Sequence, residues 1–167
     1  MNTKPLIVYY SLEGNTRLIA EAMAEAVGAD LLPIKPQNEI GTGFSRYLWG
    51  SAQVMMKKKP ELIPFDHNPM DYDLIFIGTP VWAYTFAPPI ASILEQVDLS
   101  GKDVALFCCH GGKYGKTFDK LKEMLPDSRV LGETDFFEPM KKDRSKALER
   151  AGEWAGKMMQ DRRQTGE

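Results

Sequence analysis

The segment Ser11-Leu-Glu-Gly-Asn-Thr16 combines residue types that can bind a phosphate group. It joins an apolar run to a run with helical spacing, so backbone amides and the positive end of a helix dipole can face an anion. Gly14 permits a close approach of the backbone. An ordinary helix capped by Asn15 or Thr16 would have a similar sequence, so both interpretations stand. The residues that would form a phosphate cradle are Ser11, Leu12, Glu13, Gly14, Asn15 and Thr16.

A second segment, Gly78-Thr-Pro-Val-Trp-Ala-Tyr84, places two aromatic side chains outside the spacing of a core element. Their flat surfaces suit a flat aromatic ligand. The alternative is that both rings only cover the rim of a sheet. The residues expected at a ligand are Pro80, Val81, Trp82, Ala83 and Tyr84.

A third segment, His110-Gly-Gly-Lys-Tyr-Gly115, has three glycines and another ring. Glycines leave space for a group close to the backbone, although they also serve turns that need a positive φ. His110 could donate to a ligand or could cap the loop. Cys109 ends the preceding apolar run, and nothing in its surroundings indicates an activated thiolate. The residues expected at the site are Cys109, His110, Gly111, Gly112, Tyr114 and Gly115.

Apolar runs that alternate with helical patterns must position these segments. Continuous β-branched and aromatic runs are typical of strands buried on both faces, and apolar residues at helical spacing indicate the helices between them. Strands are expected at Leu6–Tyr10, Leu31–Ile34, Leu74–Ile77, Val104–Cys109 and from Val130-Leu131 to Phe136-Phe137; helices are expected from Asn15 or Thr16 to Gly28, from Pro88 to Leu94, from Thr117 to Leu125 and from Asp143 to Met159.

This alternation predicts an α/β fold with a doubly wound, five-stranded parallel sheet in the order 2-1-3-4-5, between two layers of helices. The connection 36–73 is too long for a structureless loop, and its apolar spacing predicts a crossover helix. That helix would carry Phe44, Tyr47, Leu48, Ala52, Met55 and Met56.

Length and composition favour one domain over residues 1–167, because 167 residues with 43% hydrophobic content can bury a single sizeable core. With 21 basic and 23 acidic residues, the net charge of −2 argues against a nucleic-acid binder. Neither a signal peptide nor a membrane-length apolar run is evident. The adjacent Cys108 and Cys109 suit neither a structural disulfide nor a metal, so a reducing cytoplasm is expected.

Ligands of open parallel sheets bind outside the carboxyl ends of the strands, where the strand order reverses. The three segments each follow a strand that ends there, so we expect them to meet. A phosphate cradle at one end and aromatic faces at the other describe an FMN site. A nucleoside-triphosphate loop or a dinucleotide loop would need glycine and lysine patterns that are absent.

The three segments resemble those of the flavodoxin family, whose phosphate loop has the form Ser/Thr-x-Thr-Gly-x-Thr. Ser11, Gly14 and Thr16 match this form, whereas Glu13 replaces a hydroxyl residue and must point toward solvent. The resemblance implies FMN as cofactor, with the isoalloxazine between the loops Pro80–Tyr84 and Cys109–Gly115. Carriers of this family are usually strongly acidic, and the net charge of −2 departs from that habit.

The sequence therefore predicts an FMN-binding electron-transfer protein that needs no catalytic base and exchanges electrons with redox partner proteins, as a monomer or weak homodimer. One alternative is an FMN-dependent NAD(P)H oxidoreductase acting on quinones or similar acceptors. Another is a flavin-free interaction domain. A phosphoacceptor receiver domain is disfavoured because Tyr10-Ser11 and Gly78-Thr79 stand where it needs acidic residues.

Overall fold

The computed structural model describes residues 4–38 and 59–166. Its sheet has five parallel strands in the order β2-β1-β3-β5-β6, so the predicted order 2-1-3-4-5 is confirmed for these strands. A sixth, short strand pairs antiparallel with the end of β3 and was not predicted. The strands are β1 (Leu6–Tyr9), β2 (Asp30–Pro33), β3 (Leu74–Trp82), β4 (Thr85–Phe86), β5 (Asp103–His110) and β6 (Arg129–Phe137).

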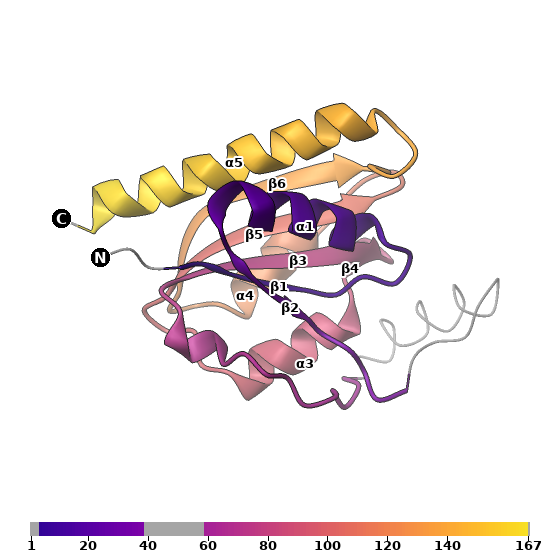
Figure 1. The fold of residues 1–167 in the computed structure, drawn as a ribbon. Coiled ribbons are helices and arrows are strands. Elements are labelled where there is room, and N and C mark those ends of the chain that lie inside the picture. The colour runs from indigo at the N-terminus through magenta and orange to yellow at the C-terminus, as the bar shows by residue number, and fades with distance from the viewer. Residues whose placement is uncertain (1–3, 39–58, 167) are drawn as a thin grey trace.

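Helices cover both faces of the sheet, as Figure 1 shows. Helices α1 and α5 lie side by side on one face, and α3 and α4 cover the other. The predicted three layers are thus confirmed. The helices are α1 (Asn15–Val27), α3 (Pro88–Gln96), α4 (Thr117–Glu123) and α5 (Arg144–Thr165), with a short 3-10 helix η1 (Pro69–Asp71). None of these helices is long and apolar enough to cross a membrane.

The continuous apolar runs of the strands explain the two-sided core. Along β1, Leu6 and Val8 pack toward α3 and α4, whereas Ile7 and Tyr9 pack toward α1 and α5. Successive side chains of a strand point to opposite faces, so an uninterrupted apolar run fills both interfaces. This arrangement makes the sheet a rigid frame for the loops at its carboxyl edge.

Several predicted boundaries were wrong in detail. Helix α1 begins at Asn15 with Gly14 as its N-cap, so Asn15 and Thr16 do not cap it. Strand β3 continues past Gly78 to Trp82, because its last residues pair with β4 and β5. Helix α5 runs on to Thr165, where Gly166 ends it. The helix predicted around Phe44 to Met56 lies outside the described residues.

Ion pairs tie the strands together at the amino edge of the sheet. Asp103 accepts two hydrogen bonds from the Arg129 guanidinium, at 2.7 and 2.8 Å. Arg162 reaches Asp103 at 3.4 Å and Asp73 at 3.3 Å, so the end of α5 is tied to the starts of β3 and β5. Asp103 is buried, so these ion pairs belong to the structural core that holds the sheet together.

A second polar cluster surrounds the start of β2. Asp30 pairs with Lys4 at 2.5 Å and accepts a hydrogen bond from the Tyr72 hydroxyl at 2.7 Å. His67 Nδ1 lies 3.0 Å from the same hydroxyl oxygen. The hydrogen bonds from Lys4 and Tyr72 lower the pKa of Asp30. Burial, followed by the bond to Asp30, raises the pKa of Tyr72 to about 12.

Candidate functional site

A cavity of about 710 Å³ lies at the carboxyl edge of the sheet. This volume falls within the range of cofactor sites. The three segments singled out in the sequence meet there, together with the loop that follows β6. The lining residues are Ser11, Leu12, Glu13, Asn15, Thr16, Pro80, Val81, Trp82, Ala83, Tyr84, Cys109, His110, Gly111, Gly112, Lys113, Glu138 and Lys141.

Most of the residues expected at a ligand line this cavity. Three expected residues do not line it, and three residues that were not expected do. Gly14, Tyr114 and Gly115 do not line it, whereas Lys113, Glu138 and Lys141 do and were not expected. Lys113 stands within the third segment. Glu138 and Lys141 follow β6, so the rule that places loops at the carboxyl edge could have indicated them too.

The loop between β1 and α1 offers an N-terminus with no side-chain cap. The Gly14 N–H donates to Ser11 Oγ at 3.2 Å, and this bond shapes the loop. Asn15 Oδ1 accepts a hydrogen bond from the Met140 N–H at 3.1 Å, which ties α1 to the loop after β6. No side chain among the described residues caps the first turn of α1. Its amides can therefore serve an anion.

The Thr16 hydroxyl is a buried donor at this end of the cavity. Thr16 is 1% exposed, and its Oγ1 has no nitrogen or oxygen partner in the described part of the chain. Its polar neighbour is the Cys109 thiol, which is a weak hydrogen-bonding partner, so the hydroxyl can still bond an oxygen of a ligand in the cavity.

The two cysteines do not supply a thiolate. Cys109 lines the cavity, and burial raises its pKa to about 12, although a hydrogen bond with Thr16 opposes this shift. Burial likewise raises the pKa of Cys108. Both thiols therefore stay protonated at neutral pH, and they act as small apolar groups in the wall.

Trp82 and Tyr84 form the aromatic side of the cavity, and they are presented differently. Trp82 is half-buried at the end of β3 and meets Tyr10 edge to face, with 5.6 Å between ring centroids. Tyr84 is 69% exposed. The Trp82 ring is thus fixed by the core, whereas the Tyr84 ring stands free at the mouth.

The two-residue turn between β3 and β4 is strained. Ala83 has a φ of 48° and Tyr84 a φ of 63°, although neither is a glycine. Hairpin turns with two positive φ angles strongly favour Asn-Gly, and each other residue type held there costs about 1–3 kcal/mol. Strain at a cavity wall is typical of functional sites, where surrounding contacts maintain it.

Gly115 and Lys116 hold this turn in place from the third segment. The Lys116 N–H donates to the Tyr84 carbonyl oxygen at 2.8 Å. Gly115 has a φ of 56°, and a Cβ there would stand 2.6 Å from Tyr84 Cβ and 2.8 Å from its carbonyl oxygen. Gly115 therefore supports the cavity wall from behind. The space that this glycine leaves is filled by the backbone of the neighbouring turn.

His110 uses both ring nitrogens within the protein. The Gly112 N–H lies 3.3 Å from Nδ1, so Nδ1 accepts this bond and the proton resides on Nε2. Nε2 then donates to Asp135 at 2.7 Å. The ring also contacts Tyr114 and Phe137, at centroid distances of 6.3 and 5.9 Å. These contacts make His110 the residue that fixes the glycine-rich loop.

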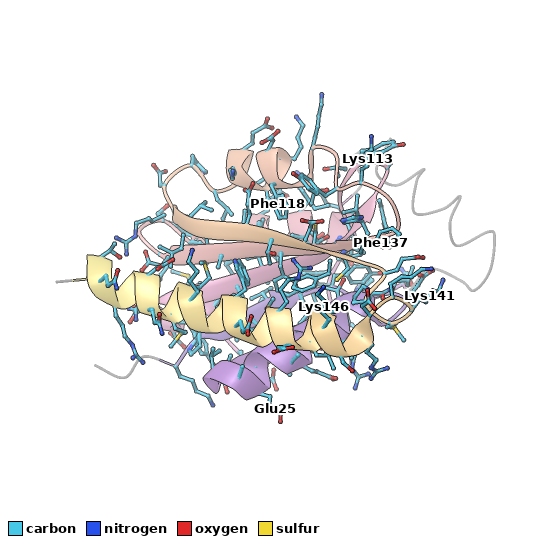
Figure 2. The ribbon with its side chains drawn as sticks, turned by 90° about the horizontal axis from the view of Figure 1, so that it is seen from above. Glu25, Lys113, Phe118, Phe137, Lys141 and Lys146 are labelled. Carbon is cyan, nitrogen blue, oxygen red and sulfur yellow. The ribbon has the colours of Figure 1, made fainter. Side chains whose placement is uncertain are left out.

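Charged side chains surround the mouth of the cavity. Lys113, Glu138 and Lys141 line it, and Lys141 pairs with Glu138 at 3.6 Å. Glu13 also lines the cavity, and its side chain is exposed. Figure 2 shows Lys113, Phe137 and Lys141 along the same edge of the molecule.

Residues 4–148 match a family model described as flavodoxin. The chain belongs to the flavodoxin family. This member of the family is 28% identical over 158 residues to a protein from Gluconacetobacter diazotrophicus named NAD(P)H dehydrogenase (quinone), with 77% of this chain and 69% of the relative covered.

Two solved structures are similar to this family member over most of its length. One is a flavoprotein from Lactobacillus acidophilus in complex with FMN, at 27% identity and a TM-score of 0.69, with 84% of this chain and 97% of that chain covered. The other is a candidate flavoprotein from Bacteroides eggerthii, at 30% identity and a TM-score of 0.71, with 80% and 87% covered.

Proposed function

We propose that the cavity binds one FMN and that the protein transfers electrons through it to and from redox partner proteins. The observation that carries this proposal is a single cavity with unused donors at one end and aromatic side chains at the other. The Thr16 hydroxyl and the uncapped amides of α1 fit a phosphate group. Trp82 and Tyr84 fit a flat ring.

The chain's own residues would bind and orient the cofactor. The segment from Ser11 to Thr16 would hold the phosphate, and the loops Pro80–Tyr84 and Cys109–Gly112 would hold the isoalloxazine. Bound FMN supplies reversible electron transfer. Aromatic packing against the ring and the nearby phosphate disfavour additional negative charge on the flavin, so we expect a lower reduction potential than that of free FMN.

Neither His110 nor Cys109 is poised as an acid or base toward a substrate in the cavity. Both nitrogens of His110 are bonded within the protein, and the Cys109 thiol stays protonated. A protein that only accepts and passes on electrons needs no acid or base of its own, so these two residues are compatible with the carrier function.

A second candidate function is that of an FMN-dependent NAD(P)H oxidoreductase acting on quinones or similar acceptors. The name of the Gluconacetobacter diazotrophicus relative favours it, at 28% identity. Such an enzyme would use the same cavity and the same phosphate cradle.

Anaerobic mixing of the FMN-loaded protein with NADPH distinguishes the two functions. A carrier keeps its flavin absorbance when NADPH is added alone and loses it with dithionite. Rapid bleaching of the flavin by NADPH, reversed by benzoquinone, would contradict the carrier function and support the oxidoreductase. A protein that takes up no FMN would contradict both.

Trp82 provides a direct test of the aromatic contact. FMN added to apoprotein should quench Trp82 fluorescence, while Trp154, which packs against Phe76, provides a core tryptophan for comparison. The Trp82→Ala variant should bind FMN more weakly, by about 1–3 kcal/mol for the loss of ring stacking. An unchanged affinity of that variant for FMN would remove Trp82 from the site.

A further inference from the structure

The loops around the cavity carry an excess of basic side chains. The segments 11–16, 80–86, 110–116 and 138–146 contain six basic and three acidic residues, whereas the whole chain has a net charge of −2. One of the three acidic residues, Glu138, is paired with Lys141. Positive charge is therefore concentrated at one edge of a chain whose remainder is net negative.

At least three of these basic groups make no ion pair among the described residues. Lys113, Lys116 and Lys142 are exposed, and none has an ion-pair partner within residues 4–38 and 59–166. At the amino edge, in contrast, Lys4 and Arg129 each pair with a carboxylate. Exposed lysines without partners add little to the stability of the fold, but they direct the approach of an oppositely charged molecule.

Large apolar side chains stand exposed among these lysines. Tyr84 is 69%, Tyr114 41%, Phe137 48% and Met140 44% exposed. Each is tied to the cavity: Tyr84 lines it, Tyr114 and Phe137 contact the His110 ring, and the Met140 N–H bonds Asn15. Aromatic residues and methionine are enriched in protein interfaces, where tyrosine often carries much of the binding energy.

We propose that this edge, here named the mouth surface, docks a small acidic electron-transfer protein. The mouth surface comprises Lys113, Lys116, Lys141 and Lys142 together with Tyr84, Tyr114, Phe137 and Met140. Its apolar residues supply the contact area, and its lysines match acidic side chains around the partner's redox centre. The proposal rests on the proposed function, because docking here places the partner over the cavity.

Binding of the FMN-loaded protein to two probe proteins of opposite charge tests this docking. The probes are an acidic plant-type ferredoxin and the basic cytochrome c, titrated by calorimetry at about 20 and about 200 mM sodium chloride. The loaded protein is used because the FMN phosphate offsets part of the positive charge. Its flavin absorbance is recorded first, so a failure to bind FMN is detected separately from a failure to dock.

A matched pair of double variants locates the surface. Lys116→Glu/Lys142→Glu changes two exposed side chains that do not line the cavity, and it leaves the backbone bond from Lys116 to Tyr84 in place. Lys157→Glu/Arg163→Glu makes the same charge change at two exposed residues of α5 that do not line the cavity. We expect ferredoxin to bind, with an affinity that falls at least about tenfold at the higher salt. The first variant should lose at least about tenfold in affinity and keep its FMN, while the second binds as the parent does.

Four outcomes would overturn the proposal. One is a fully FMN-loaded protein that binds no ferredoxin at low salt. Another is binding of cytochrome c in preference to ferredoxin. The third is equal loss of ferredoxin affinity in both double variants, which would mean that net charge alone, and not the mouth surface, governs the interaction. Sedimentation of the loaded protein detects the fourth, because self-association abolished by Lys116→Glu/Lys142→Glu would assign the surface to a second copy.

Discussion

The two edges of the sheet use their polar groups in opposite ways. At the amino edge, Asp103 and Arg129 form a bidentate ion pair, and Asp30 takes hydrogen bonds from Lys4 and Tyr72. At the carboxyl edge, the Thr16 hydroxyl has no nitrogen or oxygen partner among the described residues, and the first turn of α1 has no side-chain cap. The named groups at the amino edge bond one another, whereas the carboxyl edge leaves the first-turn amides of α1 without a side-chain partner in the described residues.

The same contrast holds for the backbone and for apolar side chains. The turn at Ala83 and Tyr84 is held in a left-handed conformation next to the cavity. Four of the large apolar side chains that are exposed in the described residues also lie at this edge. Unused donors, backbone strain and exposed rings in one place distinguish a binding edge from a structural one, even though both belong to the same sheet.

The largest expected effect is at Gly115. In Gly115→Ala the new Cβ would clash with Tyr84, and the residue would keep a positive φ, so we expect a loss of about 2–4 kcal/mol in unfolding free energy. The affinity for FMN should fall as well, because the turn beside the cavity must move. Urea unfolding and an FMN titration measure the two effects.

Gly28→Ala is the matched control for Gly115→Ala. Gly28 also has a positive φ, of 69°, but nothing lies within 4 Å of a Cβ placed there. We expect it to cost only about 1 kcal/mol and to leave FMN affinity unchanged. Equal losses of stability and of FMN affinity in both variants would mean that Gly115 does not support the turn.

The next largest effect is at the amino edge. Asp103→Asn removes a carboxylate that is hydrogen-bonded twice to Arg129, and we expect a loss of about 2 kcal/mol in unfolding free energy with no change in FMN affinity. Glu123→Gln, which breaks only the exposed pair with Lys120, should change stability by less than about 0.5 kcal/mol. Weakened FMN binding in Asp103→Asn would show that the edges are not independent.

Thr16→Val tests whether a polar group at the carboxyl edge serves the ligand and not the stability of the fold. In the apoprotein the Thr16 hydroxyl has only a weak bond with the Cys109 thiol to lose, so stability should change little while FMN affinity falls about tenfold. Thr117→Val is the control, because the Thr117 hydroxyl donates to the Tyr114 carbonyl oxygen at 2.6 Å. That variant should lose about 1 kcal/mol of stability. The reverse pattern would assign the Thr16 hydroxyl to the fold.

The smallest effect is a pH dependence at Asp30 and Tyr72. The pKa of Tyr72 is raised from 10 to about 12, so its contribution to stability is complete below pH 10 and is lost as the pH rises toward 12. The pKa of Asp30 is lowered from 3.8, so its contribution is complete above that value and is lost as the pH falls below it.

Tyr72→Phe tests this dependence by difference. The stability difference between parent and variant should be constant from about pH 6 to about pH 9 and should shrink in both outer ranges. Thermal unfolding of both proteins across the pH range measures it. A difference that does not change with pH would mean that the Asp30–Tyr72 hydrogen bond contributes nothing specific.

Local sequence patterns were enough to predict the sheet and most of the cavity wall. The continuous apolar runs within β1, β3 and β5 fix the frame, and the crossover rule then brings their loops to one edge. Residues 11–16 were singled out because their types fit an anion at a helix N-terminus, and all of them except Gly14 line the cavity. Each of these inferences depends on residues near one another in the chain.

Features that depend on contacts between distant segments could not be predicted. Ala83-Tyr84 carries no turn signal, and its left-handed conformation depends on contacts with Gly115 and Lys116, about thirty residues further along the chain. The strand β4 was missed for the same reason. The hydrogen bond between His110 and Asp135 likewise joins two strands, and no local sequence pattern indicates it.

The most direct test of the account compares FMN with riboflavin in titrations of the apoprotein. The two ligands share the isoalloxazine and differ in the phosphate, so their affinities report on the Thr16 end of the cavity separately from the aromatic end. We predict one FMN per chain, bound at least about tenfold more tightly than riboflavin. Equal affinities, or no uptake of FMN, would contradict the assignment of the carboxyl edge as a phosphate and flavin site.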